Sequence, residues 1–348
     1  MSTLVEDELL AAIIAAPDDD APRLVLADWL SERGDPRGEQ IAVEVALARA
    51  KEPSALAARA AELRASIAMP TLAGIDAEFR NSRGMIDHAT LTIEALLDRE
   101  AEVLAVAPLL RSIEVTGVNA STVTALLTRS WFSRVRSLEM SWYVPGEAVE
   151  ALASSPAARG LDRISIHHAG LPVSAFAALG ASQHLVGLRV LDLSLSGATD
   201  DGVGALLSHG GLPSLATLDL RNNRIGTAGC QAVADCGSPL RRLHIGWNRL
   251  GHRGVTVIAH APRRRELALL DLDHVQTGEK GCAAIAAANL PLETLSLHQS
   301  KVDDAGARHL LGSPSLTANL RALDLRSNHL STGVSAALRE GFGARVQL

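Results

Sequence analysis

The feature that most constrains the fold of this chain is a spacing of apolar residues that recurs along most of its length. Within residues 215–225, apolar side chains stand at the first, fourth, sixth and eleventh positions and an asparagine at the ninth: Leu215, Leu218, Leu220, Asn223 and Ile225. The spacing returns 25 residues later as Leu240, Leu243, Ile245, Asn248 and Leu250. One such short strand cannot bury its own apolar face, so successive units must stack on each other.

Nine units follow when the chain is aligned on the second apolar position. The intervals run from 25 to 28 residues, and the aligned residues are Ile113, Leu138, Ile164, Leu191, Leu218, Leu243, Leu270, Leu295 and Leu323. A glycine follows ten or eleven residues later in six of the units, next to a run of small apolar residues: Gly202, Gly229, Gly254, Gly281, Gly306 and Gly333. Each unit is therefore predicted to be a strand followed by a return helix.

Strand, asparagine turn and helix at this period resemble ribonuclease-inhibitor-type leucine-rich repeats, over residues 86–340. The resemblance implies an α/β solenoid with a curved parallel sheet inside and helices outside. We expect a capping strand at 86–93 and a last edge strand within 344–348, which would cover an otherwise open sheet edge. Only three units keep the asparagine, so the turns of the others should be less regular, especially in the first four; the replacements are Val118, Tyr143, Ala169, Ser196, Val275 and Ser300.

The first 70 residues have the pattern of a small all-α N-terminal module. Helices are predicted at 6–16, from Pro22 with Asp20 as its cap, from Pro36 with Asp35 as its cap, and at 53–67. Trp29 is predicted to lie in the core. Arg33, Asp35, Arg37 and Glu39 are either an interaction surface or local caps and ion pairs.

A second resemblance covers roughly residues 5–50. The stretch AAPDDDAPRLVLADWLSERGDPRGEQI is similar to the bacterial repeat-companion domain, and FRNSRGM at 79–85 is similar to the link by which that module enters its repeats. The matching landmarks are Asp18, Asp19, Asp20, Arg23, Leu24, Ala27, Asp28, Trp29, Leu30, Glu32, Arg33, Gly34, Asp35, Pro36, Arg37, Gly38 and Glu39. This family implies no known chemistry. The expected organisation is a helical module at 1–70, a linker and capping strand at 71–93, and a repeat arc of about nine units at 94–348.

Charge and cysteine content narrow the function classes. The net charge is -6, with 8 basic and 15 acidic residues in the first 80, and no part of the chain has the concentrated basic surface that nucleic acid requires. We interpret the run 263–265 of three arginines as a solvated turn. Three cysteines without metal-ligand spacing favour small packed side chains in a reducing cytoplasm over disulfides. No apolar run reaches ~18 residues, which predicts no membrane span. Arginine in place of lysine suggests a bacterial source.

Polar residues between the inward leucines are predicted to line the concave face. Asp192, Asp219, His244 and Asp271 hold the middle strand position, and the next outward position carries His167, Arg221, Asp273, His298 and Arg326. A solvated face is the favoured interpretation, because any such repeat places polar residues there. A hydrolase centred on Asp271, Asp273 and His298, or a metal site using His244 and Asp271, is the alternative.

The position just past each strand forms a rim that should be exposed. Two of the four tryptophans fall there, Trp142 and Trp247, together with His168, and the single tyrosine, Tyr143, is next to Trp142. Such residues are common at interaction hot spots, although tryptophans that fold over neighbouring loops would give the same pattern.

The sequence thus predicts a non-enzymatic scaffold that binds a protein partner through the concave face and the rim. No cofactor, metal, nucleic acid or membrane is expected, and the partner and oligomeric state stay open. A regulator of a small GTPase, with Arg221 and Asn248 as test positions, is the alternative, and a hydrolase is a distant third. The residues proposed to bind the partner are Trp142, Tyr143, His167, His168, Asp192, Asp219, Arg221, His244, Trp247, Asp271, Asp273, His298 and Arg326.

Overall fold

The computed structural model describes residues 2–50, 54–208, 210 and 212–348. They form two compact units. The N-terminal unit comprises Met1–Thr116 with Arg134–Leu138, and the C-terminal unit comprises Gly117–Ser133 with Glu139–Leu348. Each is described by itself.

The N-terminal unit begins with four helices around one small core. They are α1 (Ser2–Ala15), α2 (Ala21–Ser31), α3 (Pro36–Arg49) and α4 (Ser54–Ser66), as expected from the sequence; Pro53, the expected start of the last, is outside the described residues. Their core contains Ile13, Leu26, Leu30, Ile41 and Val45. Trp29, predicted to be core, is only partly buried: it packs against this cluster while the Arg33 guanidinium lies 3.9 Å from its ring centre.

One of the two predicted helix caps is wrong. The Asp35 carboxylate accepts a hydrogen bond from the Arg37 N–H at 2.9 Å, as expected. Asp20 makes no cap hydrogen bond, because its carboxylate instead accepts from Arg49 and Arg83, each at 2.9 Å. Asp19 accepts from the Ala21 N–H in its place. Asp19 therefore caps α2, while Asp20 forms hydrogen bonds from the start of α2 to Arg49 at the end of α3 and to Arg83.

The link after α4 contains a β-hairpin that the sequence analysis did not foresee. β1 (Glu78–Ser82) pairs antiparallel with β2 (Met85–Thr92), and the two residues between them, Arg83 and Gly84, have φ of 49° and 76°. Two consecutive positive φ values define the type I′ turn that suits strand twist. β2 is the expected capping strand. It pairs in parallel with β3 (Ser112–Thr116), after α5 (Ile93–Asp98) and α6 (Glu100–Val106).

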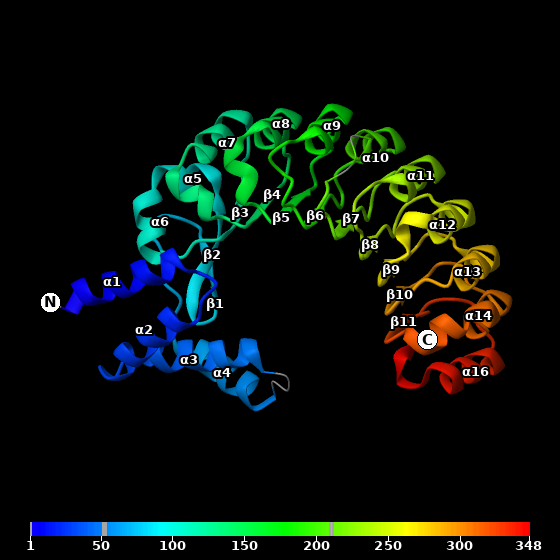
Figure 1. Cartoon of the computed structure of the whole chain (residues 1–348), viewed down its shortest axis with the longest axis horizontal. Helices are drawn as coiled ribbons and strands as arrows, with labels where there is room; N and C mark the ends of the chain where they lie inside the picture. The colour runs from blue at the N-terminus through cyan, green and yellow to red at the C-terminus, as the bar shows by residue number, and fades with distance from the viewer. Residues whose placement is uncertain (1, 51–53, 209, 211) are drawn as a thin grey trace. The chain divides into compact units, whose positions relative to one another are not determined.

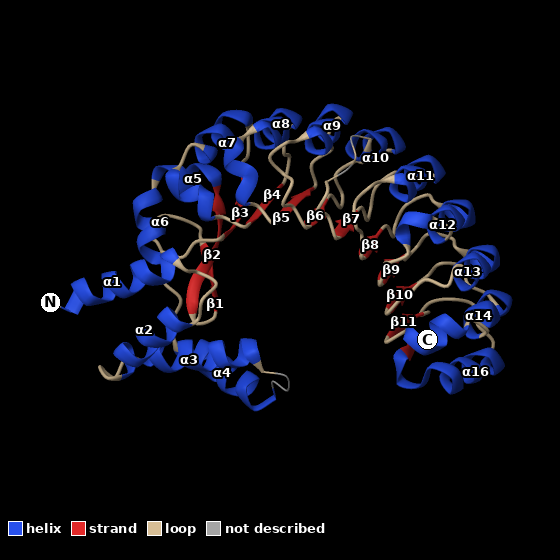
Figure 2. Cartoon of the chain, in the orientation of Figure 1, coloured by secondary structure: helices blue, strands red, loops and turns tan. Residues whose placement is uncertain are grey.

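The C-terminal unit is a solenoid of strand-and-helix repeats. Its strands line the inner side of a curve and its helices the outer side (Figures 1 and 2). The elements are α7 (Ala120–Leu127), β4 (Ser137–Ser141, divided between the units), α8 (Gly146–Ser154), β5 (Arg163–His167), α9 (Val173–Ala181), β6 (Val190–Asp192), α10 (Asp200–Leu207), β7 (Thr217–Asp219), α11 (Thr227–Asp235), β8 (Arg242–His244), α12 (Gly251–Ala259), β9 (Leu269–Asp271), α13 (Gly278–Ala287), β10 (Thr294–Ser296), α14 (Asp304–Leu311), α15 (Pro314–Asn319), β11 (Ala322–Asp324), α16 (Thr332–Phe342) and β12 (Val346–Gln347). Short 3-10 turns lie at Ser130–Arg134, Pro156–Gly160, Pro262–Arg264 and Gly343–Arg345.

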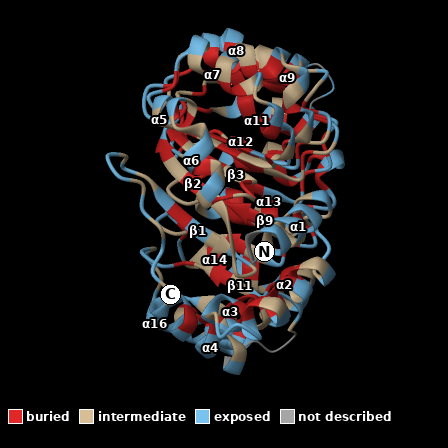
Figure 3. Ribbon diagram, turned by 90° about the vertical axis from the view of Figure 1, so that its left-hand side faces the viewer, coloured by how far each residue is buried: buried red, intermediate tan, exposed pale blue. Residues whose placement is uncertain are grey.

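Strand register confirms the alignment of the repeats. From β5 to β12 each strand pairs in parallel with the next one in the chain. The aligned apolar residues are direct partners, as in Leu218 with Leu243 and Leu270 with Leu295. The expected last edge strand is β12, which pairs with β11. The aligned leucines from β6 to β11 are at most 1 % exposed, and Figure 3 marks buried stretches on both strands and helices. The fold is the predicted leucine-rich solenoid.

Buried asparagine amides connect successive repeats. The Asn248 Nδ2 donates to the carbonyls of Leu220 and Ile245, at 2.8 and 3.0 Å, while its Oδ1 accepts from the Ile225 N–H at 3.0 Å. Asn223 makes the same three kinds of bond one repeat earlier. Of the two serines that replace asparagine, Ser300 donates its hydroxyl to the preceding repeat's Leu272 carbonyl at 2.6 Å, whereas Ser196 donates to the Leu193 carbonyl of its own repeat.

The aligned glycines allow neighbouring helices to pack closely. A Cβ at Gly254 would lie 2.9 Å from the Cys230 sulfur of the preceding helix, and one at Gly306 would lie 3.2 Å from that of Cys282. Both thiols are free and buried, and burial raises the pKa of each to about 12. Cys236 is also free and buried, so all three cysteines are small packed residues, as predicted.

The arginine run at 263–265 corrects the sequence analysis. Arg263 and Arg265 are exposed, but Arg264 is fully buried. Its guanidinium donates to the carbonyls of Cys236 and Ser238 in the preceding inter-repeat loop, at 2.6 and 3.0 Å. The interpretation of a solvated turn is therefore wrong for Arg264, because the loop below it presents carbonyls that need donors. Within the described part of the chain, no helix is long and apolar enough to cross a membrane.

We predict that Asn248→Ala lowers the free energy of unfolding by about 2–4 kcal/mol, because the Ile245 carbonyl and the Ile225 N–H lose this partner and the Leu220 carbonyl keeps only its bond from Asn223. Urea denaturation followed by circular dichroism measures the change. The matched control is Asn319→Ala at an exposed site, expected to change stability by less than about 0.5 kcal/mol. Equal effects at the two sites would contradict a bridging role for Asn248.

Candidate functional site

Aspartates at the middle strand position have a backbone role. Each accepts a hydrogen bond from the N–H two residues later, at 2.9–3.1 Å; the four are Asp192, Asp219, Asp271 and Asp324. That N–H does not face the following strand, so the side chain satisfies it. Asp219 and Asp271 are only 6 % and 7 % exposed, so at these positions the expectation of a solvated face is wrong.

The charges of the concave face largely neutralise each other. The Arg221 Nε donates to Asp219 at 2.9 Å, and that of Arg326 donates to Asp324 at 3.0 Å. His167 lies between two carboxylates, with its Nε2 3.0 Å from Glu139 and its Nδ1 3.7 Å from Asp192. Hydrogen bonding to Asp192, and then to Glu139, raises the pKa of His167 to about 10. Several carboxylates of the expected acidic face are thus ion-paired within the fold, whereas Asp273 accepts hydrogen bonds from neutral donors.

The residues of the hydrolase hypothesis do lie together. Asp271 and Asp273 have hydrogen-bond partners, whereas the Nδ1 of His298 is buried with none among the described residues. The Asp273 Oδ1 accepts from the Ser296 hydroxyl and, at 2.9 Å, from the backbone N–H of His298. Asp271 faces the His244 Nδ1 at 3.3 Å. Burial raises the pKa of Asp273. Among the described residues, no three His, Cys, Asp or Glu side chains are arranged to hold a metal ion.

The residues chosen to test a GTPase regulator have structural partners. The Arg221 guanidinium is bound to Asp219, and Asn248 is 6 % exposed with its amide bonded to the backbone. Neither side chain is free to reach a nucleotide site.

The rim position just past each strand has a left-handed backbone throughout. Its φ values lie between 50° and 69°, at Gly117, Trp142, His168, Leu195, Asn222, Trp247, His274, Gln299 and Ser327. The rim N–H still donates to the next repeat, as from Leu195 to the Arg221 carbonyl at 3.0 Å and from His274 to the His298 carbonyl at 2.9 Å. This conformation costs an L-residue roughly 1–2 kcal/mol, least for glycine and asparagine. A tryptophan there is not explained by backbone preference.

Both rim tryptophans stack on the rim histidine of the following repeat. The Trp142 and His168 rings are 4.7 Å apart and 5° from parallel, and those of Trp247 and His274 are 3.4 Å apart at 25°. The tryptophans nevertheless stay 58 % and 49 % exposed, and Tyr143 is 86 % exposed. Each indole therefore has one face supported by a histidine and a large exposed remainder. It packs on a neighbouring loop, as one interpretation of the sequence expected, and is still available to a partner, as the other expected.

A polar pocket adjoins the Trp247 stack through their shared residue His274. Its volume is about 290 Å³, and its lining residues are His274, Gln276, Gln299, Lys301, Ser327 and His329. The Lys301 ammonium donates to the Gln276 amide oxygen at 3.1 Å. The sequence analysis did not select these residues. Gln276 and Lys301 each lie two residues past a rim position. Their φ values of 59° and 56° make each of them a second left-handed residue in its repeat.

Comparisons with known proteins agree with this geometry. The family described as Leucine Rich repeat matches residues 211–234 and 238–259. These two stretches contain β7 with α11 and β8 with α12, that is, two of the repeats. The ribonuclease inhibitor of Sus scrofa is 31% identical over 164 residues, which are 44% of this chain and 36% of that protein, so the match spans about a third of the relative's length.

The matched solved structures are more distant in sequence. A protein from Bacteroides fragilis has a TM-score of 0.39 at 14% identity, covering 69% of this chain and 66% of that one. The yeast Rad7 and Elc1 complex has a TM-score of 0.41 at 12% identity, covering 69% of this chain and 68% of that one. An internalin from Listeria monocytogenes has a TM-score of 0.37 at 14% identity, covering 77% of this chain and 90% of that one.

The His167 ion pairs predict a pH dependence of stability. The folded-state pKa of about 10 lies above the ordinary 6.5, so the stabilisation is complete below pH 6.5 and is lost as the pH rises toward 10. We expect a loss of about 1–3 kcal/mol across this window, because the partly exposed site is screened by water.

The free energy of unfolding is measured by urea denaturation at several pH values between 6.5 and 10, which gives its slope against pH. His167→Gln, which does not titrate, should flatten it, whereas His252→Gln at an exposed position should not. A slope unchanged in His167→Gln would show that these pairs do not couple folding to protonation.

Proposed function

We propose that this chain is a non-enzymatic scaffold that binds a protein partner through the rim of its C-terminal unit, with Trp142, Tyr143 and Trp247 as anchors. The observation that carries the proposal is the position of these aromatic side chains. They stand in left-handed backbone positions that do not favour them, and they remain largely exposed. Strained and exposed aromatic residues are typical of binding surfaces.

The stacked histidines support this role by fixing the indoles in place. Because His168 and His274 already hold one face of each ring, little rotamer freedom is lost when a partner covers the other face. Beside Trp247, the polar pocket offers amide, hydroxyl and ammonium groups. A partner segment with an apolar side chain next to a hydrogen-bonding or acidic one would match this surface.

The concave face is proposed to contribute orientation rather than most of the affinity. Several of its charged groups are already paired, as Arg221 is with Asp219, so a partner gains little by replacing those pairs. The residues assigned to this secondary role are His167, Asp192, Asp219, Arg221, His244, Asp271, Asp273, His298 and Arg326.

The matched relative supports binding over catalysis, since its name states that it inhibits another protein, a ribonuclease. We further propose that the N-terminal helices are a bacterial repeat-companion module at 1–70, joined through 71–93 to a repeat arc at 94–348. Three free buried cysteines support a reducing, cytoplasmic location.

We predict that the double variant Trp142→Ala, Trp247→Ala binds the partner at least about 30-fold more weakly, because each anchor at a hot spot contributes about 2 kcal/mol or more. The full chain, immobilised, is used to capture partners from an extract of the source organism, and the affinity of each captured protein is then measured by calorimetry.

The matched control is Val186→Ala, which removes an apolar side chain that is 50 % exposed but lies away from the rim. It should leave the affinity unchanged. If every captured protein binds the double tryptophan variant as tightly as the unchanged chain, the rim is not the binding surface.

A further inference from the structure

Five exposed side chains form a line beside the rim in the later repeats of the C-terminal unit. Each stands two residues past a rim position, and we call the line the basic row: Arg224, Arg249, Gln276, Lys301 and His329. Successive strands of these repeats pair in register at about 4.8 Å, so equivalent positions follow one another along the solenoid. The basic row contains three permanent cations and no acid.

The polar pocket beside Trp247 lies where the basic row meets the rim. Its lining residues are the rim and basic-row residues of three consecutive repeats, and none of them is acidic. The imidazole, amide, hydroxyl and ammonium groups that line it can all donate hydrogen bonds. The Lys301 ammonium uses one N–H on the Gln276 amide oxygen, which leaves two for a bound group. A negatively charged acceptor suits such a pocket best.

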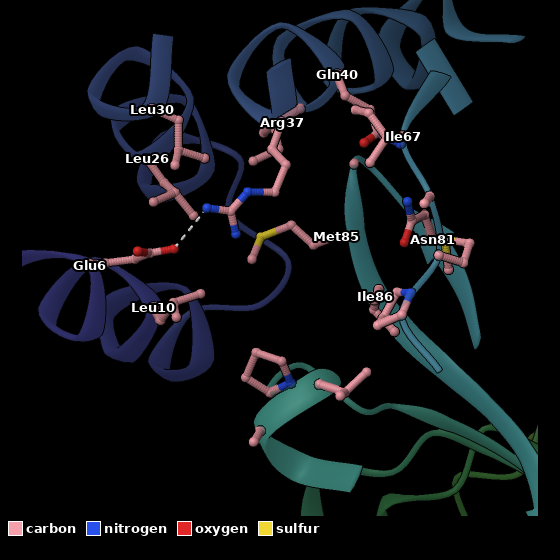
Figure 4. A pocket seen from close by; sticks show the side chains of 18 residues that line it. Glu6, Leu10, Leu26, Leu30, Arg37, Gln40, Ile67, Asn81, Met85 and Ile86 are labelled. Atoms are coloured by element: carbon pink, nitrogen blue, oxygen red, sulfur yellow. Dashed lines mark hydrogen bonds and ion pairs between the residues drawn. The ribbon is translucent and has the colours of Figure 1, made fainter. Parts of the chain in front are cut away.

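The cations of the basic row differ from those at the sites described above because they have no carboxylate partner. On the concave face, Arg221 donates to Asp219 at 2.9 Å. In the N-terminal unit, Arg37 of α3 donates to Glu6 of α1 at 3.2 Å (Figure 4). Within the described part of the chain, none of the three basic-row cations forms an ion pair. Their charge is therefore available to a partner.

Acidic side chains at the starts of the neighbouring helices are bonded elsewhere. The Asp200 carboxylate accepts from the N–H groups of Gly226 and Gly229, at 2.7 and 2.8 Å. The Asp303 carboxylate accepts from the N–H of Gly306 at 2.8 Å and so caps α14. These carboxylates hold helix starts in place and do not pair with the basic row.

The basic row does not reach the other rim tryptophan. In the repeat of Trp142 and the two repeats that follow it, the equivalent positions are Val144, Gly170 and Gly197, which carry no charge. Trp247 therefore adjoins positive charge, whereas Trp142 adjoins uncharged residues. A partner that lies along the rim would present acidic groups at one end only.

Nucleic acid matches this surface less well than an acidic peptide does. A typical nucleic-acid site makes about 6–10 phosphate contacts, more than three cations can supply. Carboxylates of the adjoining concave face, such as Asp192 and Asp324, would repel a strand with a charge at every nucleotide. A peptide can place its few carboxylates only where the cations are.

Building on the proposed function of the rim, we propose that the partner segment bound beside Trp247 is an acidic peptide. One of its carboxylates enters the pocket at Lys301, and others pair with Arg249 and Arg224. Charge-assisted hydrogen bonds hold these carboxylates, while the indole covers the apolar part of the segment.

Two short synthetic peptides are the probes: one repeats leucine–glutamate–glutamate, and the other has glutamine in place of glutamate. They are titrated into the full-length protein while NMR follows the indole N–H signals, assigned with Trp142→Phe and Trp247→Phe. Saturable shifts should be larger at Trp247 than at Trp142 and absent at Trp131, which is 5 % exposed. The glutamate peptide should bind at least about ten-fold more tightly, and about 0.3 M salt should reduce this preference by screening.

The triple variant Arg224→Gln, Arg249→Gln, Lys301→Gln should remove the preference for glutamate. The matched control makes the same change of charge at exposed arginines away from the rim: Arg263→Gln, Arg265→Gln, Arg339→Gln. The first two precede β9, whereas the rim follows the strands, and the third is in α16. This control should keep the preference.

Equal affinity for the two peptides, or a preference that survives the basic-row variant, would overturn the proposal. Tighter binding of an oligouridylate with the same number of negative charges, lost in that variant, would also overturn it and assign the row to nucleic acid.

The partners captured from an extract separate this inference from the proposed function. Partners weakened by the double tryptophan variant but not by the basic-row variant would leave the rim as the binding surface and refute an acidic partner. Partners weakened by the basic-row variant but not by the tryptophan variant would support an acidic partner and contradict the tryptophan anchors.

Discussion

The C-terminal unit depends on backbone groups being satisfied between repeats and not only within them. Strands of three residues offer few ladder bonds, so the chain needs further donors where it leaves the sheet. Asn223 and Asn248 supply them by bonding carbonyls of their own and the preceding repeat. Arg264 does the same for an inter-repeat loop with a charged side chain. Stability is therefore shared between neighbours, as expected of a solenoid.

The hydrogen-bond partners of the backbone also distinguish polar residues with a structural role from residues available to a partner. Aspartates in the middle of the strands satisfy an N–H that the sheet leaves unpaired, and arginine or histidine then pairs with them. Many polar side chains of the concave face therefore already bond to other groups of the chain. The rim differs, because its backbone is satisfied by the next repeat whatever the side chain. Trp142 and Trp247 are thus free of structural demands except for a supporting histidine.

Periodicity allowed the repeat fold to be predicted down to strand register, because each aligned leucine is buried for the same reason in every unit. It did not reveal the partners of polar side chains, since Asp20 and Arg264 bond to groups that only the folded chain brings near. The hairpin was missed although its turn signal was present: Arg83-Gly84 lies between two β-prone stretches. Exposure of the rim tryptophans was foreseen, but their left-handed backbone required the structure.

Departures from regular pairing are where this chain carries polar or aromatic groups that its own fold does not use. At the rim, a left-handed residue in every repeat permits an exposed indole that no core position would accept. In the hairpin, one extra residue, Asp87, shifts the register beside Asn81, whose buried oxygen lacks a partner. Each arrangement is locally unfavourable in the folded chain, the first through its left-handed backbone and the second through an unpaired acceptor. The repeated template explains stability, and the first of these local exceptions, at the rim, explains where recognition is to be sought.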